Sequence, residues 1–297
     1  RAAAKDTDLS ALQAEGAGFI VLGGYEDSQT YVPVFDGTNE TGSHITWNKS
    51  SWEYSPINYW LEGKTYKFVA YAPAKLQEGD LFDIDYTGNK LKMKDGGTFT
   101  ADGETDLVVA EGKPQGYPVA AEPVQMETVG FKFYHALSKV KFTFINGWRN
   151  AVTLKITNIK LSNVKNTGSL TTSGTMAQGS DKIQLSAWSG QTGTADYEDK
   201  ADGMNTDEYE ASYEFENFLL PTVLNDSQMK LTFTVQVTNS QGTGPDLGAG
   251  AGNPVNKEVV IPKDVVTEWM PGYAYNYKLT ISGSTFGLKP IQFDDID

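Results

Sequence analysis

The sequence predicts an all-β protein made of two antiparallel β-sandwiches in tandem. Between residues 229 and 238 apolar and polar residues alternate without exception, and they alternate in the same way between 273 and 282. Such alternation puts one face of a strand in a core and the other in water, which is typical of antiparallel sandwiches rather than buried parallel sheets. Because 297 residues exceed what one sandwich core usually holds, we expect two domains.

The first half of the chain predicts one short helix followed by short strands. Residues 7–15 form the expected helix, with Thr7 or Asp8 as its N-cap and Gly16 after its end. Turns rich in Gly, Asp and Asn separate the strands that follow. The expected strands are 19–25, 31–35, 44–47, 64–71, 81–86, 90–93 and 106–110.

The second half predicts seven further strands, two of them irregular. In 131–144 the alternation slips by one residue near Ser138, and in 152–164 it slips between Ile156 and Ile159. Each slip predicts a β-bulge, and we expect Phe133, Leu137, Val140 and Phe142 on the buried side of the first strand. The expected strands are 131–144, 152–164, 182–187, 212–219, 229–238, 256–261 and 273–282.

A proline-rich stretch, residues 113–127, separates the two sets of strands. It contains Pro114, Pro118 and Pro123, and a proline cannot donate the hydrogen bond that a central strand requires. The predicted domains are therefore residues 1–127 and 128–297.

Composition excludes several classes of function. Lys and Arg number 24 against 38 Asp and Glu, and the resulting net charge of -14 argues against nucleic acid as a partner. No apolar run approaches the roughly 18 residues of a membrane span. The opening residues 1–5 do not read as a signal peptide, so we expect a mature chain. The absence of cysteine excludes disulfides, thiol nucleophiles and cysteine-ligated metals.

The sequence contains no recognisable catalytic or cofactor motif. His44 and His135 are its only imidazoles, they lack the spacing of a metal-binding pair, and no GxSxG turn is present. The glycine-rich stretch 241–253 lies between two strands and opens no helix, so we interpret it as a hairpin connection rather than a nucleotide loop. A carboxylate pair for glycoside hydrolysis stays open, because the second carboxylate can come from anywhere in the chain.

Two acidic stretches, residues 83–88 and 189–209, are candidate cation sites. The sequence from Asp83 to Gly88 resembles the start of an EF-hand loop, but Lys94 occupies the position that needs a bidentate glutamate. In 189–209 the acidic side chains suit a solvated surface. That surface comprises Asp199, Asp202, Asp207 and Glu208. We predict no metal site.

Aromatic residues crowd into the segment 47–60. Trp47, Trp52 and Trp60 lie there with two tyrosines, and aromatic platforms of this kind stack sugar rings. Large aromatics also fill the cores of small sandwiches. Both interpretations stay open, so a surface glycan-binding sandwich protein is the alternative function.

Several blocks resemble the fimbrillin family, the subunits of type V pili of Bacteroidales. The signature-like block is His-Ala-Leu-Ser-Lys at 135–139, inside a long predicted strand. The other blocks follow in the order of the family. They are Gly-Phe-Ile-Val-Leu-Gly-Gly-Tyr at 18–25, Tyr-Trp at 59–60, Phe-Val-Ala-Tyr-Ala-Pro at 68–73, Asp-Leu-Val-Val-Ala at 106–110, Leu-Leu-Pro at 219–221 and Trp-Met-Pro-Gly at 269–272.

The resemblance implies a structural pilus subunit rather than an enzyme, in a shaft, tip or anchor position and with a role in adhesion. It implies two transthyretin-like sandwich domains, no cofactor, and an outer-membrane lipoprotein precursor whose mature form lies in a cell-surface pilus. Its partners would be other pilus subunits, together with host or bacterial surface ligands. In this family an arginine-specific or trypsin-like protease removes a leader and first strand, and a strand of another subunit fills the groove.

Both ends of the chain match that mechanism. Arg1 and Ala2 are the residues expected at the protease junction, although cleavage after Arg1 would leave Ala2 first. Near the other end, Ile291, Phe293 and Ile296 follow the last strong strand and form the predicted donor strand.

Overall fold

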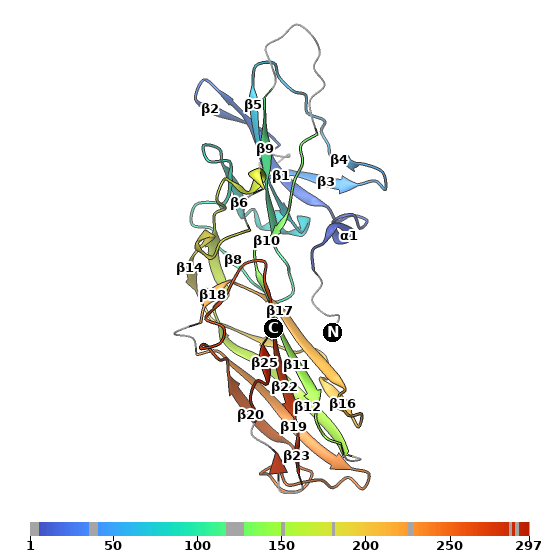
Figure 1. Ribbon diagram of the computed structural model, residues 1–297. Coiled ribbons are helices and arrows are strands. Elements are labelled where there is room, and N and C mark those ends of the chain that lie inside the picture. Colours follow the sequence, from blue (N-terminus) through green and yellow to red (C-terminus); the bar gives the residue numbers. More distant parts are fainter. Residues whose placement is uncertain are drawn as a thin grey trace.

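The protein is almost entirely β-structure, as predicted. The computed structural model describes residues 6–35, 41–116, 128–149, 152–179, 182–224, 228–284, 287–288 and 291–296. In Figure 1 two β-rich halves are stacked end to end in an elongated molecule, with the earlier residues in the upper half. The helices of the described residues are α1 (Leu9–Leu12), η1 (Ala74–Gly79), η2 (Met176–Gln178) and η3 (Leu185–Ala187).

The predicted first helix is shorter than expected. It is a single turn that ends at Leu12, and its N-cap is Asp8, whose carboxylate accepts a hydrogen bond of 2.8 Å from the backbone N of Ala11. Gly16 follows it with φ of 74°, a conformation that glycine adopts without strain.

A seven-stranded sheet organises the first half. Its order is β10-β9-β5-β1-β3-β4, and β2 also pairs with β1. The strands are β1 (Phe19–Asp27), β2 (Thr30–Phe35), β3 (Ser43–Trp47), β4 (Trp52–Glu53), β5 (Thr65–Ala72), β9 (Val108–Gly116) and β10 (Tyr134–His135). A separate hairpin joins β6 (Phe82–Asp85) to β7 (Lys90–Met93), so all seven strands predicted in this half are present.

The central strand β1 is buried on both faces, which explains its unbroken apolar run from Phe19 to Leu22. Its register with β2 shifts between Gly23 and Gly24. A Cβ on Gly24 would lie 2.1 Å from the carbonyl oxygen of Val32, so only glycine allows β2 to approach at this irregularity.

Two sheets pack face to face in the second half. One has the order β17-β11-β22-β25 and the other β15-β12-β19-β20, with β16 also beside β12. The first contains β17 (Ser212–Leu219), β11 (Ser138–Asn146), β22 (Ala274–Ile281) and β25 (Asp295–Ile296). The second contains β15 (Ala195–Glu198), β12 (Val152–Val164), β16 (Met204–Thr206), β19 (Lys230–Asn239) and β20 (Val255–Val260). Strands β11 and β22 run parallel, whereas their other neighbours in the sheet are antiparallel.

Alternation predicted the buried faces of the long strands well. The predicted apolar residues in and beside β19 are all buried, and the slip in β12 is a bulge, with a register shift between Thr157 and Lys160. One assignment is wrong, because Tyr273 lies just before β22 and is exposed. The ammonium group of Lys182 lies over its ring, 4.1 Å from the centroid.

The slip near Ser138 is not a bulge. Tyr134 and His135 pair with β9 in the first half, whereas Ser138 begins β11 in the second half. The two residues between them, Ala136 and Leu137, are both buried, and the alternation changes phase because the chain leaves one sheet for another. We call this crossing between the halves the waist.

Several predicted boundaries also differ. Residues 182–187 contain the 3-10 turn η3 rather than a strand, and β9 continues to Gly116, with Pro114 beside a register shift against β5. Segments 166–179 and 189–209, which lie outside the expected strands, contribute strands. The additional strands are β8 (Phe99–Thr100), β13 (Thr167–Leu170), β14 (Trp188–Thr192), β18 (Thr222–Val223), β21 (Glu268–Trp269), β23 (Gly283–Ser284) and β24 (Gly287–Leu288), together with β15 and β16.

Three groups of buried side chains hold the fold together. The second-half core lies between the two sheets of that half and includes Phe142, Phe233 and Tyr277. The central core lies on one face of the seven-stranded sheet, and the apolar face, with Phe19 and Phe68, lies on the other. Division of the chain into domains at 127/128 stays a prediction, but the central core joins residues 20–109 to residues 136–220.

Candidate functional site

The C-terminal segment 291–296 lies along the outer edge of β22. Ile291, Phe293 and Ile296 are partly buried against the second-half core, whereas Gln292 and Asp294 are exposed. The three residues predicted as a donor strand are therefore together, and they pack against their own chain. Two register pairs join β25 to β22.

Phe293 is the main apolar anchor of this segment. Its ring centroid lies 5.2 Å from that of Tyr277 and 6.2 Å from that of Phe142, both inside the second-half core. The backbone N of Asp294 donates to the carbonyl oxygen of Lys278 at 2.8 Å, and its carboxylate accepts from the backbone N of Thr280 at 2.6 Å. The segment is held by three partly buried apolar side chains, of which Phe293 is the aromatic one, and by these hydrogen bonds.

An open hollow of about 510 Å³ lies between this segment and the end of β20. Val260 and Val265 line it and expose 62% and 68% of their surface. The C-terminal segment thus covers only part of the apolar surface at this edge.

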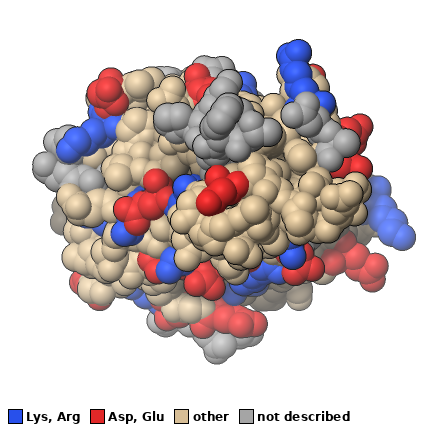
Figure 2. Space-filling model, turned by 90° about the horizontal axis from the view of Figure 1, so that it is seen from below, with Lys and Arg blue, Asp and Glu red and all other residues tan. Residues whose placement is uncertain are grey.

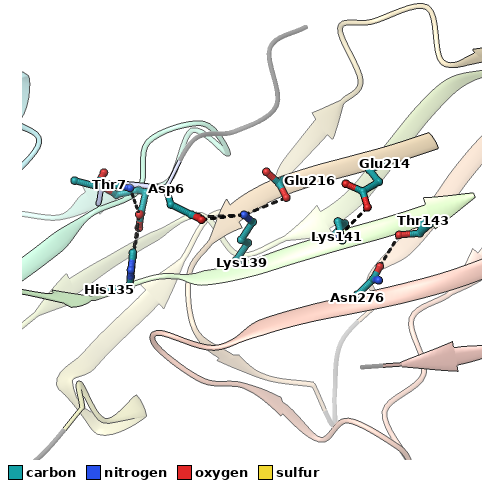
Figure 3. A network of polar contacts seen from close by, with 10 residues as sticks. Asp6, Thr7, His135, Lys139, Lys141, Thr143, Glu214, Glu216 and Asn276 are labelled. Carbon is teal, nitrogen blue, oxygen red and sulfur yellow. Dashed lines mark hydrogen bonds and ion pairs between the residues drawn. The ribbon is translucent and has the colours of Figure 1, made fainter. Parts of the chain in front are cut away.

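A polar network at the waist holds the N-terminal segment (Figure 3). The carboxylate of Asp106 is fully buried, and it accepts hydrogen bonds from the backbone N of Thr7 at 2.7 Å and from Nδ1 of His135 at 2.9 Å. Lys139 Nζ lies 3.1 Å from Asp6 and 3.3 Å from Glu216. The network therefore joins the start of the chain and the residues just before β9 to β10, β11 and β17.

Two pKa values reflect this network. The hydrogen bond to Asp106 raises the pKa of His135 above its usual value, although partial burial opposes the change. Burial alone would lower the pKa of Lys139, but its interactions with Asp6 and Glu216 outweigh burial and raise it. In both cases the neighbouring carboxylates raise the pKa by stabilising the charged form of the side chain.

His135 is a hydrogen-bonded structural residue in β10. Among the described residues, the recorded partner of its ring is Asp106 and not a hydroxyl nucleophile. The nearby Ser138 hydroxyl donates to the carbonyl oxygen of Met270 at 2.8 Å, and the Thr7 hydroxyl donates to that of Asp106 at 2.9 Å. This arrangement anchors chain segments and provides no activated nucleophile.

The three tryptophans of the possible sugar platform pack in two places: Trp47 and Trp52 contact each other, and Trp60 contacts Tyr66. Trp47 and Trp52 face each other across the β3–β4 hairpin with ring centroids 5.2 Å apart, and Trp52 also meets Phe19 edge to face at 5.0 Å. Trp60 instead lies 4.5 Å from Tyr66. Trp52 and Trp60 cover part of the apolar face.

The acidic stretches considered as cation sites have protein partners. Asp83 lies 3.7 Å from Lys92 Nζ, and Asp199 accepts a hydrogen bond from the Tyr213 hydroxyl at 2.6 Å. No group of three or more histidine or acidic side chains within the described residues could hold a metal ion. Arg1 and Ala2, the predicted protease junction, lie outside the described residues.

Glu111 and Asp106 are buried structural carboxylates whose partners the sequence did not indicate. Glu111 is buried in β9 and accepts hydrogen bonds from the backbone N of Gly174 at 2.6 Å and of Met176 at 2.8 Å. It thereby attaches a segment of the second half to the first-half sheet. A glutamate inside an apolar strand is the only signal, and it does not identify the partner.

The surface carries both signs of charge. In the end-on view of Figure 2, acidic and basic side chains are interspersed around broad uncharged areas, without one continuous basic face. No helix in the described part of the chain has the length and apolar character needed to cross a bilayer.

Comparisons with known proteins give one family. The family model described as fimbrillin-like matches residues 18–291. No curated protein matches the chain.

Solved structures of low sequence identity are also similar over nearly the whole chain. A fimbrial protein from Bacteroides vulgatus ATCC 8482 has 14% identity and a TM-score of 0.49, covering 97% of this chain and 94% of its own. A candidate cell adhesion protein from Bacteroides uniformis ATCC 8492 has 17% identity and a TM-score of 0.44, with coverage of 97% and 93%. Another from Bacteroides fragilis NCTC 9343 has 12% identity and a TM-score of 0.46, with coverage of 99% and 91%.

The match of the family model extends over most of the chain, and it agrees with the all-β fold and with the order of the sequence blocks. The predicted membership of this family is confirmed by the family model. The chain belongs to the fimbrillin-like family, a family of fimbrial structural subunits of the cell surface and not a family of enzymes.

Proposed function

We propose that this subunit polymerises by strand exchange and that residues 291–296 are the strand it donates. The observation that carries the proposal is the attachment of this segment to β22. Ile291 and Phe293 point to the core while Gln292 is exposed, which is the pattern of an added strand. Two register pairs hold it, against eight between β11 and β22, so it is the most easily detached strand of its sheet.

The apolar face of the first half is the proposed acceptor. Phe19 and Phe68 are buried on this face, and partly buried side chains, including Phe131 and Phe133, cover them. Residues 128–133 belong to no strand, although Phe133 lies 5.2 Å from Phe19. A donated strand would replace residues 128–133 on this face, and it would add backbone hydrogen bonds to the sheet and a continuous row of apolar contacts.

In this proposal the precursor is an outer-membrane lipoprotein whose leader and first strand cover the acceptor until cleavage. An arginine-specific or trypsin-like protease would cut between Arg1 and Ala2. The two transthyretin-like sandwiches would then act as a rigid unit with a donor at one end and an acceptor at the other. N-terminal sequencing of protein taken from pili should give Ala2 first, and Arg1→Ala in the full precursor should leave the leader attached.

Polymer formation by paired variants tests the donor. The full precursor, expressed in a Bacteroidales host, would carry Phe293→Asp or, as a matched control, Gln292→Asp at the exposed neighbouring position. We expect the control to form detergent-resistant ladders and filaments in electron micrographs, and Phe293→Asp to remain monomeric but folded by circular dichroism. Normal filaments from Phe293→Asp and from a deletion of residues 288–297 would refute the donor assignment.

A further inference from the structure

We propose that β11 and β22 form a mechanical clamp that keeps the subunit folded when a filament is pulled. The source of the load rests on the proposed strand exchange, whereas the resistance itself is a property of the isolated fold. The proposal is based on the parallel direction of β11 and β22 and on the ends of these strands at which a pulling force would act.

β11 and β22 lie between the waist and the C-terminal segment, the two places at which the proposed filament would pull on the second half. β11 begins at Ser138, directly after the waist, and runs toward the end of the molecule remote from the first half (Figure 1). β22 runs parallel to it and ends at Ile281, from which the chain continues to the C-terminal segment. A pull on the chain just before the waist therefore acts on the near end of β11, and a pull on a donated C-terminal segment acts on the far end of β22.

Forces at these two ends load the ladder in shear. Eight register pairs join the strands, from Lys139 opposite Ala274 to Asn146 opposite Ile281. Because the strands are parallel and are pulled at opposite ends, the pairs share the load and must yield together. If both strands were pulled at the same end, the pairs would open one after another. Forced unfolding is limited by the height of this barrier rather than by equilibrium stability.

Hydrogen bonds extend the ladder beyond both ends. Near the waist, the backbone N of Lys139 donates to Tyr273 O at 2.9 Å and that of Gly272 donates to Leu137 O at 2.8 Å. At the far end, the backbone N of Gly147 donates to Ile281 O at 2.9 Å.

Side chains tie the two strands to each other and to β17. Thr143 on β11 donates its hydroxyl hydrogen to Asn276 Oδ1 on β22 at 2.7 Å, as Figure 3 shows. On the other side of β11, Lys141 lies 2.8 Å from Glu214 of β17. β11 is thus held from both neighbours, so the sheet offers its greatest resistance along this strand.

The C-terminal segment responds differently. Its two register pairs lie on the outer edge of β22, so a pull on Gln292 would first detach the segment and only then load the clamp. The C-terminal segment can detach easily while β22 stays in place, because the segment is held by the β22–β25 ladder and β22 by the β11–β22 ladder.

Single-molecule force spectroscopy on the full chain tests the clamp. The sequence has no cysteine, so handles attach only at introduced positions. The pair Lys132→Cys and Gln292→Cys loads the clamp in shear, whereas Lys132→Cys with Ala274→Cys pulls both strands from the waist end. All three sites are exposed. We expect the main rupture force in shear to be at least about twofold higher than in the second geometry.

A pair of matched substitutions assigns the resistance to these strands. Thr143→Val removes the Thr–Asn link of the clamp, and Thr234→Val removes a similar link of 2.8 Å from Thr234 to Asn256 between β19 and β20. We expect only Thr143→Val to lower the shear rupture force. Equal forces in the two geometries, or an equal loss with both variants, would overturn the clamp. These measurements use monomers, so their outcome is independent of whether the tail variants block polymerisation.

Discussion

Replacement of Phe142 by alanine should cause one of the largest single losses of stability in the second half. Its side chain is fully buried and occupies the middle of β11. The rings of Tyr277 and Phe215 lie 5.3 Å and 6.2 Å from it, on the two neighbouring strands, and Phe293 lies at 6.2 Å. Since backbone ladders hold both neighbouring strands, the surroundings cannot collapse into the cavity, and we expect a loss of about 4 to 5 kcal/mol.

Equilibrium unfolding in urea, followed by circular dichroism, measures this loss. The matched control is Phe131→Ala, because Phe131 is only partly buried and its segment belongs to no strand. We expect the control to lower the free energy of unfolding by about 1 to 2 kcal/mol. A loss below about 1 kcal/mol for Phe142→Ala, or equal losses for the two variants, would contradict the assignment of Phe142 to the centre of the core.

Three further outcomes are expected. Glu111→Gln should lower the free energy of unfolding by about 2 kcal/mol, because the charged hydrogen bonds from two backbone N–H groups to this carboxylate are weakened. The control is Glu258→Gln, at an exposed ion pair with Lys230, which should change the free energy of unfolding by less than about 1 kcal/mol in the same urea titration. The folded-state pKa of His135 is raised, so its protonation contributes to the stability of the fold. That contribution is complete below the unfolded pKa of about 6.5 and is lost as pH rises through the folded pKa. The difference in free energy of unfolding between wild type and His135→Gln should therefore be larger near pH 5 than near pH 9. Trp52→Ala should lower the free energy of unfolding by roughly 1 to 3 kcal/mol. A glycan-array signal that this variant loses while melting normally would instead favour the sugar platform.

Local patterns in the sequence predicted the long strands correctly. The strict alternation around β19 reflects one wet and one buried face, and the slip in β12 reflects a true bulge at Asn158. The slip near Ser138 has the same appearance in the sequence but a different cause, since the chain changes sheets there. Periodicity records only which side of the local backbone is buried, so it cannot distinguish an extra residue from a change of partner.

Contacts between distant segments could not be predicted in this way. His135 was noticed in the sequence, but its partner Asp106 depends on the register between β10 and β9. The short strands β13 and β14 are rich in Ser, Thr and Gly, and they form because they pair with each other and with β8. Tertiary pairing outweighs weak local preference in such segments. Ile291, Phe293 and Ile296 lie together against β22, a contact that depends on pairing the local sequence does not specify, and their role as a donor strand stays a prediction.

The composition of the central core determines the order in which this chain can fold. Leu170, Trp188 and Leu220, all from the second half, pack with first-half residues such as Val69 and Leu107. The indole N–H of Trp188 also donates to the carbonyl oxygen of Ala136 at 2.7 Å, on the chain that links the halves. A ribosome or translocon that has released only residues 1–127 has therefore not released enough of the protein to complete the first core. Until residue 220 emerges, the growing chain cannot bury the apolar surface of the central core, so this stage of synthesis is the one most exposed to aggregation.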